Sequence, residues 1–302
     1  MHSGLTDAAS PYLHAHGDDP VAWSPWEPAT FTRARDEDKL LLLSVGYLSC
    51  HWCHVMQRES HSDDQTARVI NDHFVAVLVD REVRPDIDLI YQSAIETLEE
   101  QVGWPLHVVL TPEGLPLGGG VYFPPAGSNR RPNFLDLVND IFEAWSRQPE
   151  VLRRRGQDAL ARIGRSIDPP PAGPQLPEDL HRDALTQLEA GFDPEHGGFG
   201  EGPMYAPKLL HPATLDLLLR LARRGFETAG QLSRRTLDAI ANGAVFDQIG
   251  GGFHHYAADR RWRVPHFEKT LYDNAQLVEV FARAWEVFDV PLHRRVCERT
   301  AE

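Results

Sequence analysis

Two cysteines, Cys50 and Cys53, stand three residues apart directly after the apolar run at residues 40–45. A continuous apolar run of this length is typical of a buried central strand. The residues from Val55 towards Asn71 read as a helix, so the sequence predicts a strand that delivers two thiols to the beginning of a helix. Backbone N–H groups are free there and carry partial positive charge, which stabilises a thiolate and makes it a nucleophile near neutral pH.

The same stretch, Cys-His-Trp-Cys-His at 50–54, also fits other chemistry. The pattern CxxCH attaches a c-type haem, but that requires export, and residues 1–20 have neither the basic start nor the apolar core of a signal peptide. Two inert core cysteines are a further alternative, which the polar His51 and the bulky Trp52 between the thiols disfavour. A catalytic thiol pair is the interpretation that these features favour.

A zinc site is the third alternative for the two thiols. A closed zinc site takes four ligands, and the remaining cysteine, Cys297, is far away in a region that reads as helical. His61 and His73 are nearer candidates for the missing ligands. We expect the protein to bind neither a metal ion nor another cofactor.

Composition limits the class of protein. The chain has 302 residues, 42% of them hydrophobic and 25% charged, which is typical of a globular protein with two domains of ordinary size. Its net charge of −14 disfavours binding to the phosphate backbone of nucleic acids, and no apolar run is long enough to span a bilayer. With three cysteines and no export signal we expect a cytoplasmic protein. In a reducing compartment a CxxC pair is more often catalytic than structural.

Buried strands and amphipathic helices alternate through the first half of the chain. The pattern predicts helices at 27–38, 55–71, 86–100 and 133–163, and strands at 40–45, 74–80, 103–110 and 121–123. This is the order of the thioredoxin fold, in which a cis-proline begins the strand that faces the thiol pair. Pro105 stands at that position, so we expect a cis bond before it. The alternative is a trans proline that begins an edge strand.

A proline-rich segment divides the chain. Residues 168–177 cannot form a helix or a central strand and should be extended and semi-rigid. The sequence therefore predicts a first domain at 1–167 and a helical domain at 178–302. Within the second domain the pattern predicts helices at 177–189, 213–224, 231–246 and 270–288, with glycine-rich or polar loops at 193–200, 247–256 and 262–269.

Ten segments match the motifs of one protein family. They are residues 19–26, 49–56, 79–88, 103–106, 122–124, 197–200, 206–208, 247–254, 264–269 and 271–275, and they include DPVAWSPW, SCHWCHVM, GWPL, DQIGGGFH and VPHFEK. The chain thus resembles the thioredoxin-domain family typified by spermatogenesis-associated protein 20 and the YyaL proteins. The resemblance implies an α/β thioredoxin-like N-terminal domain followed by an all-α (α/α) toroid, similar to six-hairpin glycosidases and sugar epimerases.

The chain departs from the family pattern in two places. The loop at 200–207 is longer than the usual junction, and the chain ends at Glu302 before the helices of a full toroid can be completed. We therefore expect an incomplete, truncated toroid. Such a half-domain exposes an apolar face, which usually means self-association or a partner.

The thiol pair has two expected roles. Cys50 should be the attacking thiolate, because the N-terminal cysteine of such a pair is the more exposed, and Cys53 should be the resolving thiol. His51 lies next to Cys50, and His54 lies one helical turn later. Either imidazolium could lower the thiol pKa further, or both could simply be solvated.

Four further residues are candidates for the surroundings of the thiols. Trp52 should shape access to the site. Asp80 ends a predicted strand nearby and either accepts a proton or begins the next turn, of which the turn is favoured. Trp104 and Pro105 should form the wall opposite the disulfide.

The helical domain offers a second set of candidates. Six polar residues could line a pocket: His254, His255, His266, Glu268, Asp273 and Asn274. The aromatic residues Trp262, Phe267 and Tyr272 could stack on a sugar ring, and paired carboxylates could serve glycoside chemistry.

These candidates support two main function classes. The first is a thiol–disulfide redox protein whose partner is a protein thiol or disulfide, or a small-molecule thiol. The alternative is a carbohydrate-active or carbohydrate-binding protein with a sugar-like ligand, in which the thioredoxin domain is regulatory. A third, non-enzymatic interpretation is a scaffold that binds a partner protein. We expect no nucleic acid and no membrane among the partners.

Overall fold

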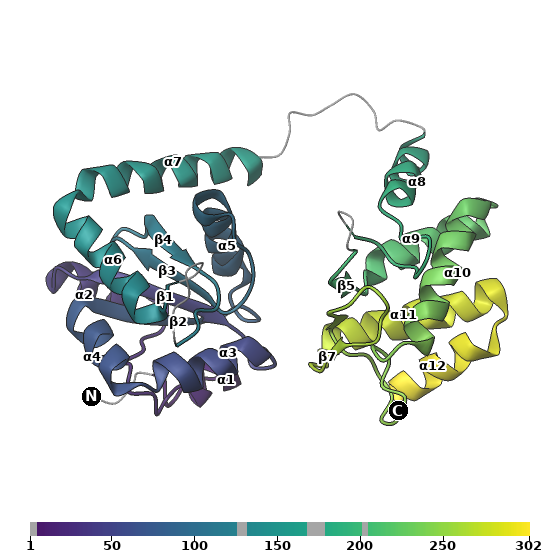
Figure 1. Ribbon diagram of the computed structural model, residues 1–302, viewed down its shortest axis with the longest axis horizontal. Helices are drawn as coiled ribbons and strands as arrows, with labels where there is room; N and C mark the ends of the chain where they lie inside the picture. The colour runs from purple at the N-terminus through teal and green to yellow at the C-terminus, as the bar shows by residue number, and fades with distance from the viewer. Residues whose placement is uncertain (1–4, 126–131, 168–178, 201–204) are drawn as a thin grey trace. The chain divides into compact units, whose positions relative to one another are not determined.

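The chain divides into two compact units, residues 1–171 and 172–302 (Figure 1). The computed structural model describes residues 5–125, 132–167, 179–200 and 205–302. The proline-rich linker predicted at 168–177 lies outside the described residues. Each unit has its own buried hydrophobic residues, so each is held together by a core of its own.

The first unit is built on a four-stranded sheet with the order β2-β1-β3-β4. Its strands are β1 (Leu40–Gly46), β2 (Phe74–Asp80), β3 (Leu106–Leu110) and β4 (Pro116–Gly120). β1 runs parallel to β2 and antiparallel to β3, and β4 is antiparallel to β3. Every residue of the four strands is buried, as continuous apolar runs predict for β1 and β2.

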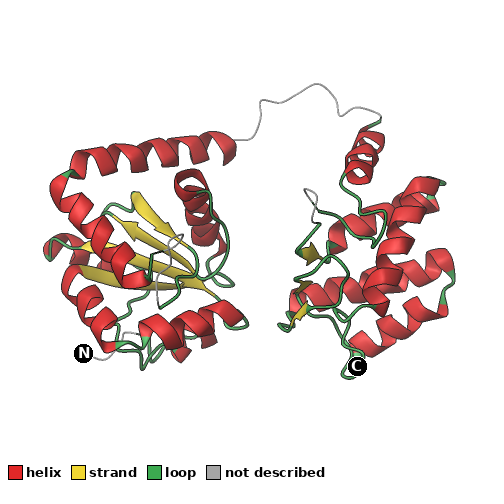
Figure 2. Cartoon of the chain, viewed as in Figure 1, coloured by secondary structure: helices red, strands yellow, loops and turns green. Residues whose placement is uncertain are grey.

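Helices cover both faces of this sheet (Figure 2). One face carries α1 (Pro11–Ala15), α3 (His51–Met56), α4 (Asp64–His73) and α6 (Phe134–Arg147). The other face carries α2 (Pro28–Asp36), α5 (Pro85–Glu99) and α7 (Pro149–Ile167). Side chains alternate between the two cores, with Leu42 on the first face and Leu41 and Leu43 on the second. The first unit is therefore a thioredoxin-like α/β domain.

The fourth strand differs from the prediction. We expected it at 121–123, but it lies at Pro116–Gly120 and consists largely of glycine. Glycine is depleted in strands, so the sequence pattern does not reveal it. A Cβ atom on Gly119 would lie 2.1 Å from the carbonyl oxygen of His107 on β3, which leaves no room for another residue there.

Two predicted helices are interrupted. The stretch at 133–163 divides into α6 and α7 around Gln148, because Pro149 has no N–H to continue the first helix. The helix predicted at 55–71 is also divided: α3 runs into a π-helical turn, η1 (Gln57–His61), and α4 begins anew. The Asp63 side chain caps α4 by accepting from the backbone N–H of Thr66 at 2.7 Å.

The second unit is mainly helical, as predicted. It contains α8 (Leu180–Ala190), α9 (Pro212–Arg223), α10 (Glu227–Asn242), α11 (Leu271–Phe288) and α12 (Pro291–Ala301). A small sheet of two-residue strands, in the order β5-β6-β7, joins Lys208–Leu209, Tyr256–Ala257 and Pro265–His266. The described helices do not show the (α/α) toroid that the family resemblance implies.

In the ranges that the structure describes, no helix has both the length and the apolar character needed to cross a bilayer.

Candidate functional site

Cys50 and Cys53 form a disulfide at the beginning of α3, with their Cα atoms 5.3 Å apart. Cys50 is the residue that caps the helix, and its sulfur accepts a hydrogen bond from the backbone N–H of Cys53 at 3.1 Å. In this paired form both cysteines are almost fully buried, with 3% of Cys50 and 1% of Cys53 exposed. The predicted difference in exposure between the two thiols is therefore slight in the disulfide state.

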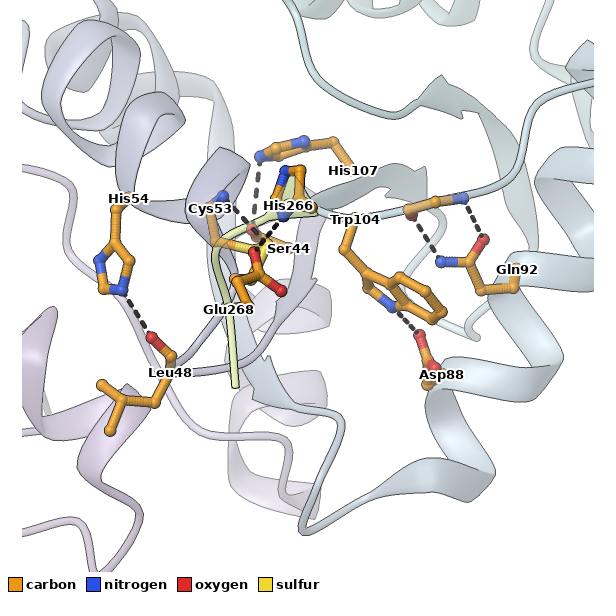
Figure 3. Close-up of a disulfide and its surroundings, with 12 residues drawn as sticks. Ser44, Leu48, Cys53, His54, Asp88, Gln92, Trp104, His107, His266 and Glu268 are labelled. Carbon is orange, nitrogen blue, oxygen red and sulfur yellow. Dashed lines mark hydrogen bonds and ion pairs between the residues drawn. A yellow bond between two sulfur atoms is a disulfide. The ribbon is translucent and has the colours of Figure 1, made fainter. Parts of the chain in front are cut away.

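The segment before β3 lies beside the end of β1, the strand that leads to the cysteines. The bond between Trp104 and Pro105 is cis, as predicted. The register pairs Leu106 with Val45, so Pro105 lies beside the end of the strand that leads to the cysteines. The Gln92 side chain, labelled in Figure 3, forms two hydrogen bonds with Gly103. The Gly103 carbonyl accepts from Gln92 Nε2 at 2.7 Å, and the Gly103 N–H donates to Gln92 Oε1 at 3.1 Å.

The Trp104 ring is fixed on several sides. Its Nε1 donates to Asp88 Oδ1 at 2.8 Å (Figure 3). The Arg81 guanidinium lies over the ring at 4.0 Å from its centroid, and the Tyr47 ring meets it edge-on at 5.9 Å. A half-buried indole with a satisfied N–H and a cation on its face is a rigid surface beside the site.

The residues between and after the cysteines lie towards the surface. Trp52 is 42% exposed and packs on Tyr122 with 4.7 Å between ring centroids, and the His51 ring meets Trp52 edge-on at 5.4 Å. His54 Nε2 donates to the backbone carbonyl of Leu48 at 2.6 Å, since a carbonyl can only accept. His54 therefore ties α3 to the loop before Cys50. The effect of either histidine on the thiols stays a prediction.

Asp80 acts in the turn after β2. Its Oδ1 accepts from the backbone N–H of Glu82 at 2.9 Å, and its Oδ2 accepts from the Ser10 hydroxyl. The side chain is buried. These contacts agree with the favoured interpretation, in which Asp80 begins the turn, and they also fix the N-terminal segment to the sheet.

A tyrosine missed by sequence reasoning lies next to the resolving cysteine. A Cβ atom on Gly46 would be 2.8 Å from Cys53 Sγ and 2.3 Å from the Tyr12 hydroxyl, so the sulfur and the phenol both crowd the same point of β1. Burial, and then the charges of Asp80 and Asp19, raise the pKa of Tyr12 far above its ordinary value. A neutral phenol therefore lies beside the Cys53 sulfur.

Sequence reasoning named His61 only as a possible zinc ligand beside the cysteines, and it missed the buried group of polar side chains to which His61 belongs, on the same face of the sheet as α3. His107, on β3, is completely buried, and its Nε2 lies 3.1 Å from His61 Nε2 and 3.3 Å from Ser44 Oγ. His16 Nδ1 donates to Asp19 Oδ2 at 2.6 Å. A histidine inside an apolar strand was the available signal, because a polar residue is seldom buried without a partner.

In the second unit the structure joins some of the six pocket candidates. His255 Nδ1 lies 2.6 Å from Asp273 Oδ2, which also accepts from Thr270 Oγ1 at 2.6 Å. Asn274 Oδ1 accepts from the backbone N–H of Phe253 at 2.6 Å, and its Nδ2 donates to the same residue's carbonyl at 3.1 Å. Asn274 therefore holds a loop in place.

The other three candidates lie in neighbouring segments. His266 Nδ1 is 3.5 Å from Glu268 Oε1, and the His266 ring stacks on Tyr256 with 4.6 Å between centroids. His254 meets Phe267 edge-on at 5.2 Å. A cavity of about 700 Å³ in this unit is lined by none of the six polar candidates. Its lining includes His196, Arg235 and Gln248, together with Trp262, one of the aromatic residues expected to stack on a sugar ring. The predicted sugar pocket stays a prediction.

Comparison with known proteins identifies relatives of the whole chain. Residues 2–164 match the family described as "Thioredox_DsbH: Protein of unknown function, DUF255". Spermatogenesis-associated protein 20 of Homo sapiens is 39% identical over 292 residues, which cover 94% of this chain and 36% of that protein. An uncharacterized protein of Caenorhabditis elegans is 38% identical over 285 residues, which cover 92% and 38% of the two chains. The chain therefore spans little more than a third of the length of these relatives.

Solved structures show similarity over a shorter part of the chain. A structure titled "DsbH Oxidoreductase" aligns with 41% of this chain and 85% of its own, at 16% identity and a TM-score of 0.32. A thioredoxin from Thermus thermophilus aligns with 41% of this chain and 87% of its own, at 17% identity and a TM-score of 0.31.

Proposed function

Because the chain belongs to the DUF255 family of thioredoxin-like proteins, we propose that it exchanges thiols and disulfides through Cys50 and Cys53. The observation that carries this proposal is the disulfide at the beginning of α3, in which the Cys53 N–H donates to the Cys50 sulfur at 3.1 Å. After reduction the same N–H is in place to stabilise a Cys50 thiolate. Hydrogen bonds to an ionised group are stronger than those to a neutral one.

The exchange proceeds in two steps. The Cys50 thiolate attacks a substrate disulfide, forms a mixed disulfide with one substrate sulfur and releases the other, which takes up a proton. Cys53 then loses its proton and attacks the Cys50 sulfur, so the Cys50–Cys53 disulfide forms and the second substrate thiol leaves. Two electrons pass from the cysteine pair to the substrate, and the reverse sequence oxidises a dithiol.

The surroundings of the sulfurs suit this chemistry. The Tyr12 hydroxyl and the Cys53 sulfur both lie close to Gly46 on β1, and the exposed Trp52 offers an apolar surface to an incoming substrate. The substrate class that fits is a protein disulfide or a small-molecule disulfide. Self-association and a cytoplasmic location stay predictions.

The proposal is tested by measuring disulfide reduction by the full chain with dithiothreitol as electron donor. We expect Cys50→Ser to reduce the rate to background, and Cys53→Ser to accumulate a mixed disulfide that mass spectrometry detects. Cys297→Ser is the matched control and should keep full activity. A Cys50→Ser variant as active as the unaltered chain would contradict the proposal.

The three thiols should also differ in alkylation. Burial, and then the charge of Glu298, raise the pKa of Cys297, and its sulfur donates to the carbonyl of Val278 at 3.4 Å. In the reduced chain at pH 7, we therefore expect iodoacetamide to modify Cys50 at least about tenfold faster than Cys297. Peptide mass spectrometry measures both rates in one sample, and equal rates would count against an activated thiol.

A further inference from the structure

We propose that His16, Asp19 and His61 form a binding site for a divalent transition-metal ion such as Zn²⁺, separate from the disulfide. Each of the three side chains offers a ligand atom, and these atoms all lie within 4.8 Å of one another. Two imidazole nitrogens and one carboxylate oxygen are ligands that zinc accepts, and three protein ligands leave one coordination position for water.

His61 supplies the strongest reason for a ligand. Its side chain is 1% exposed, and its Nδ1 has no hydrogen-bond partner among the described residues. A buried polar atom without a partner destabilises the folded state. His61 ends the π-helical turn η1, and such turns within helices are frequent at functional sites. A metal ion gives the orphaned nitrogen a partner.

The protonation states of the group suit a cation. Burial, followed by the nearby His107 and His16, lowers the pKa of His61 well below its ordinary value, so the imidazole keeps a free lone pair. Burial alone would raise the pKa of Asp19, but the hydrogen bonds from His16 and Gln57 outweigh it and hold that pKa below its usual range. The site therefore has a neutral imidazole beside an ionised carboxylate.

Neighbouring side chains hold two of the ligands in place. Trp23 Nε1 donates to Asp19 Oδ2 at 3.0 Å, and Gln57 Nε2 donates to Asp19 Oδ1 at 2.9 Å. His61 Nε2 lies 3.1 Å from His107 Nε2, which leaves Nδ1 as the nitrogen for the ion. Partners of this kind orient the ligands of protein metal sites and tune their affinity.

One contact has to open when the ion binds. His16 Nδ1 donates to Asp19 Oδ2 at 2.6 Å, and the proton of that bond occupies the space between two of the proposed ligands. An incoming cation replaces this proton, so binding should release protons, as is usual for metal sites that contain histidine.

The test uses the full chain with its disulfide intact, so that the two sulfurs cannot act as thiolate ligands. After removal of metals with a chelator, the chain is titrated with Co²⁺, whose visible absorption reports coordination, and then with Zn²⁺. The Trp23 ring lies 5.0 Å from the His61 ring, so bound Co²⁺ should also quench tryptophan fluorescence. We expect one Co²⁺ per chain, displaced by Zn²⁺.

Variants locate the ion. His61→Phe and Asp19→Asn should each weaken Co²⁺ binding at least about tenfold. The matched control is His73→Phe, because His73 packs on Phe142 outside the group and should leave binding unchanged. A Cys50→Ser/Cys53→Ser variant should also bind as the unaltered chain does, whatever the outcome of the redox assay.

Three outcomes would overturn the proposal: no stoichiometric Co²⁺ on the oxidised chain, binding that neither His61→Phe nor Asp19→Asn weakens, or binding that disappears with the cysteines. Thermal unfolding followed by circular dichroism shows which variants fold. If His61→Phe does not fold, Asp19→Asn decides, because an amide keeps the size of the carboxyl group and removes its charge.

Discussion

Two groups of buried polar side chains, one in each unit, differ in how far their donors and acceptors are used. In the first unit His61 and His107 are buried, and each keeps an Nδ1 without a partner among the described residues. In the second unit Asp193 and Lys208 are fully buried and joined at 2.9 Å, and Arg260 donates to both carboxylate oxygens of Asp193 at 2.7 Å. The second group is satisfied by the protein itself, whereas the first has capacity left for a ligand.

The second unit contains a second aspartate–lysine pair, Asp247 and Lys269, in a loop that resembles the loop of Asp193. In both loops an aspartate N–H donates to the carbonyl of the second glycine of a Gly-Gly pair, from Asp193 to Gly198 at 2.9 Å and from Asp247 to Gly252 at 2.8 Å. Lys269 contacts Asp247 at 2.6 Å, as Lys208 contacts Asp193. The Lys269 side chain is 37% exposed and the Lys208 side chain 0%.

This comparison separates structural polar groups from candidate functional ones. A buried pair whose donors and acceptors are all used contributes to the fold, and removing one partner leaves an isolated charge. A buried group with unused nitrogens gains a partner only from outside the chain. The following predictions test that distinction.

The largest effect is expected from Asp193→Ala. It leaves the Lys208 charge buried without its carboxylate, which should lower the free energy of unfolding by about 3–5 kcal/mol. Asp247→Ala makes the same change at the exposed copy and should cost no more than about 1 kcal/mol. Urea denaturation of both variants measures the difference, and equal losses would show that burial does not distinguish the two loops.

The second prediction concerns mild acid. Burial lowers the pKa of His107 to about 3, and it lowers that of His61 well below 6.5. The unfolded chain binds protons on these histidines near pH 6.5, so the stability of the first unit should fall as the pH drops below that value. Each histidine contributes a slope of about 1.4 kcal/mol per pH unit, and for His107 the loss continues to about pH 3.

The second unit should lose less stability over this range. Burial also lowers the pKa of His211 and His254, but His211 is only partly buried and His254 is 8% exposed, against 1% for His61 and 0% for His107. Burial by itself would raise the pKa of Asp193. Hydrogen bonds from Arg260 and Lys208 outweigh this effect and hold the pKa far below its usual range. The stability that the ionised Asp193 contributes is therefore fully present above about pH 3.9, the pKa of a carboxyl group in the unfolded chain, and is lost only below that pH. Hydrogen exchange of peptides from each unit at pH 7 and pH 5 distinguishes the two.

The smallest effect is expected from His61→Phe in the metal-free chain. The phenyl ring fills a site already surrounded by aromatic residues. It removes the nitrogen that has no partner, together with the Nε2 contact to His107. The free energy of unfolding should change by no more than about 1.5 kcal/mol. Urea denaturation measures it beside Asp193→Ala. A loss as large as that of Asp193→Ala would mean that His61 is part of a structural network after all.

Local patterns in the sequence were enough for several features. The continuous apolar runs predicted β1 and β2 to within a residue, because a strand buried on both faces needs apolar side chains at every position. The thiol spacing predicted the disulfide, and the position of Pro105 predicted the cis bond. Each of these features depends on residues that are close together in the chain.

Only the tertiary structure decided the rest. Gly119 of β4 is needed because the carbonyl oxygen of His107 on the neighbouring strand comes so close, and strand propensities carry no information about that distance. The group of His16, Asp19 and His61 brings His61 together with two residues that lie more than forty positions earlier in the chain. Sequence periodicity shows which face of an element is buried. Which polar atoms then meet depends on how the strands are ordered in the sheet and how the helices pack on it.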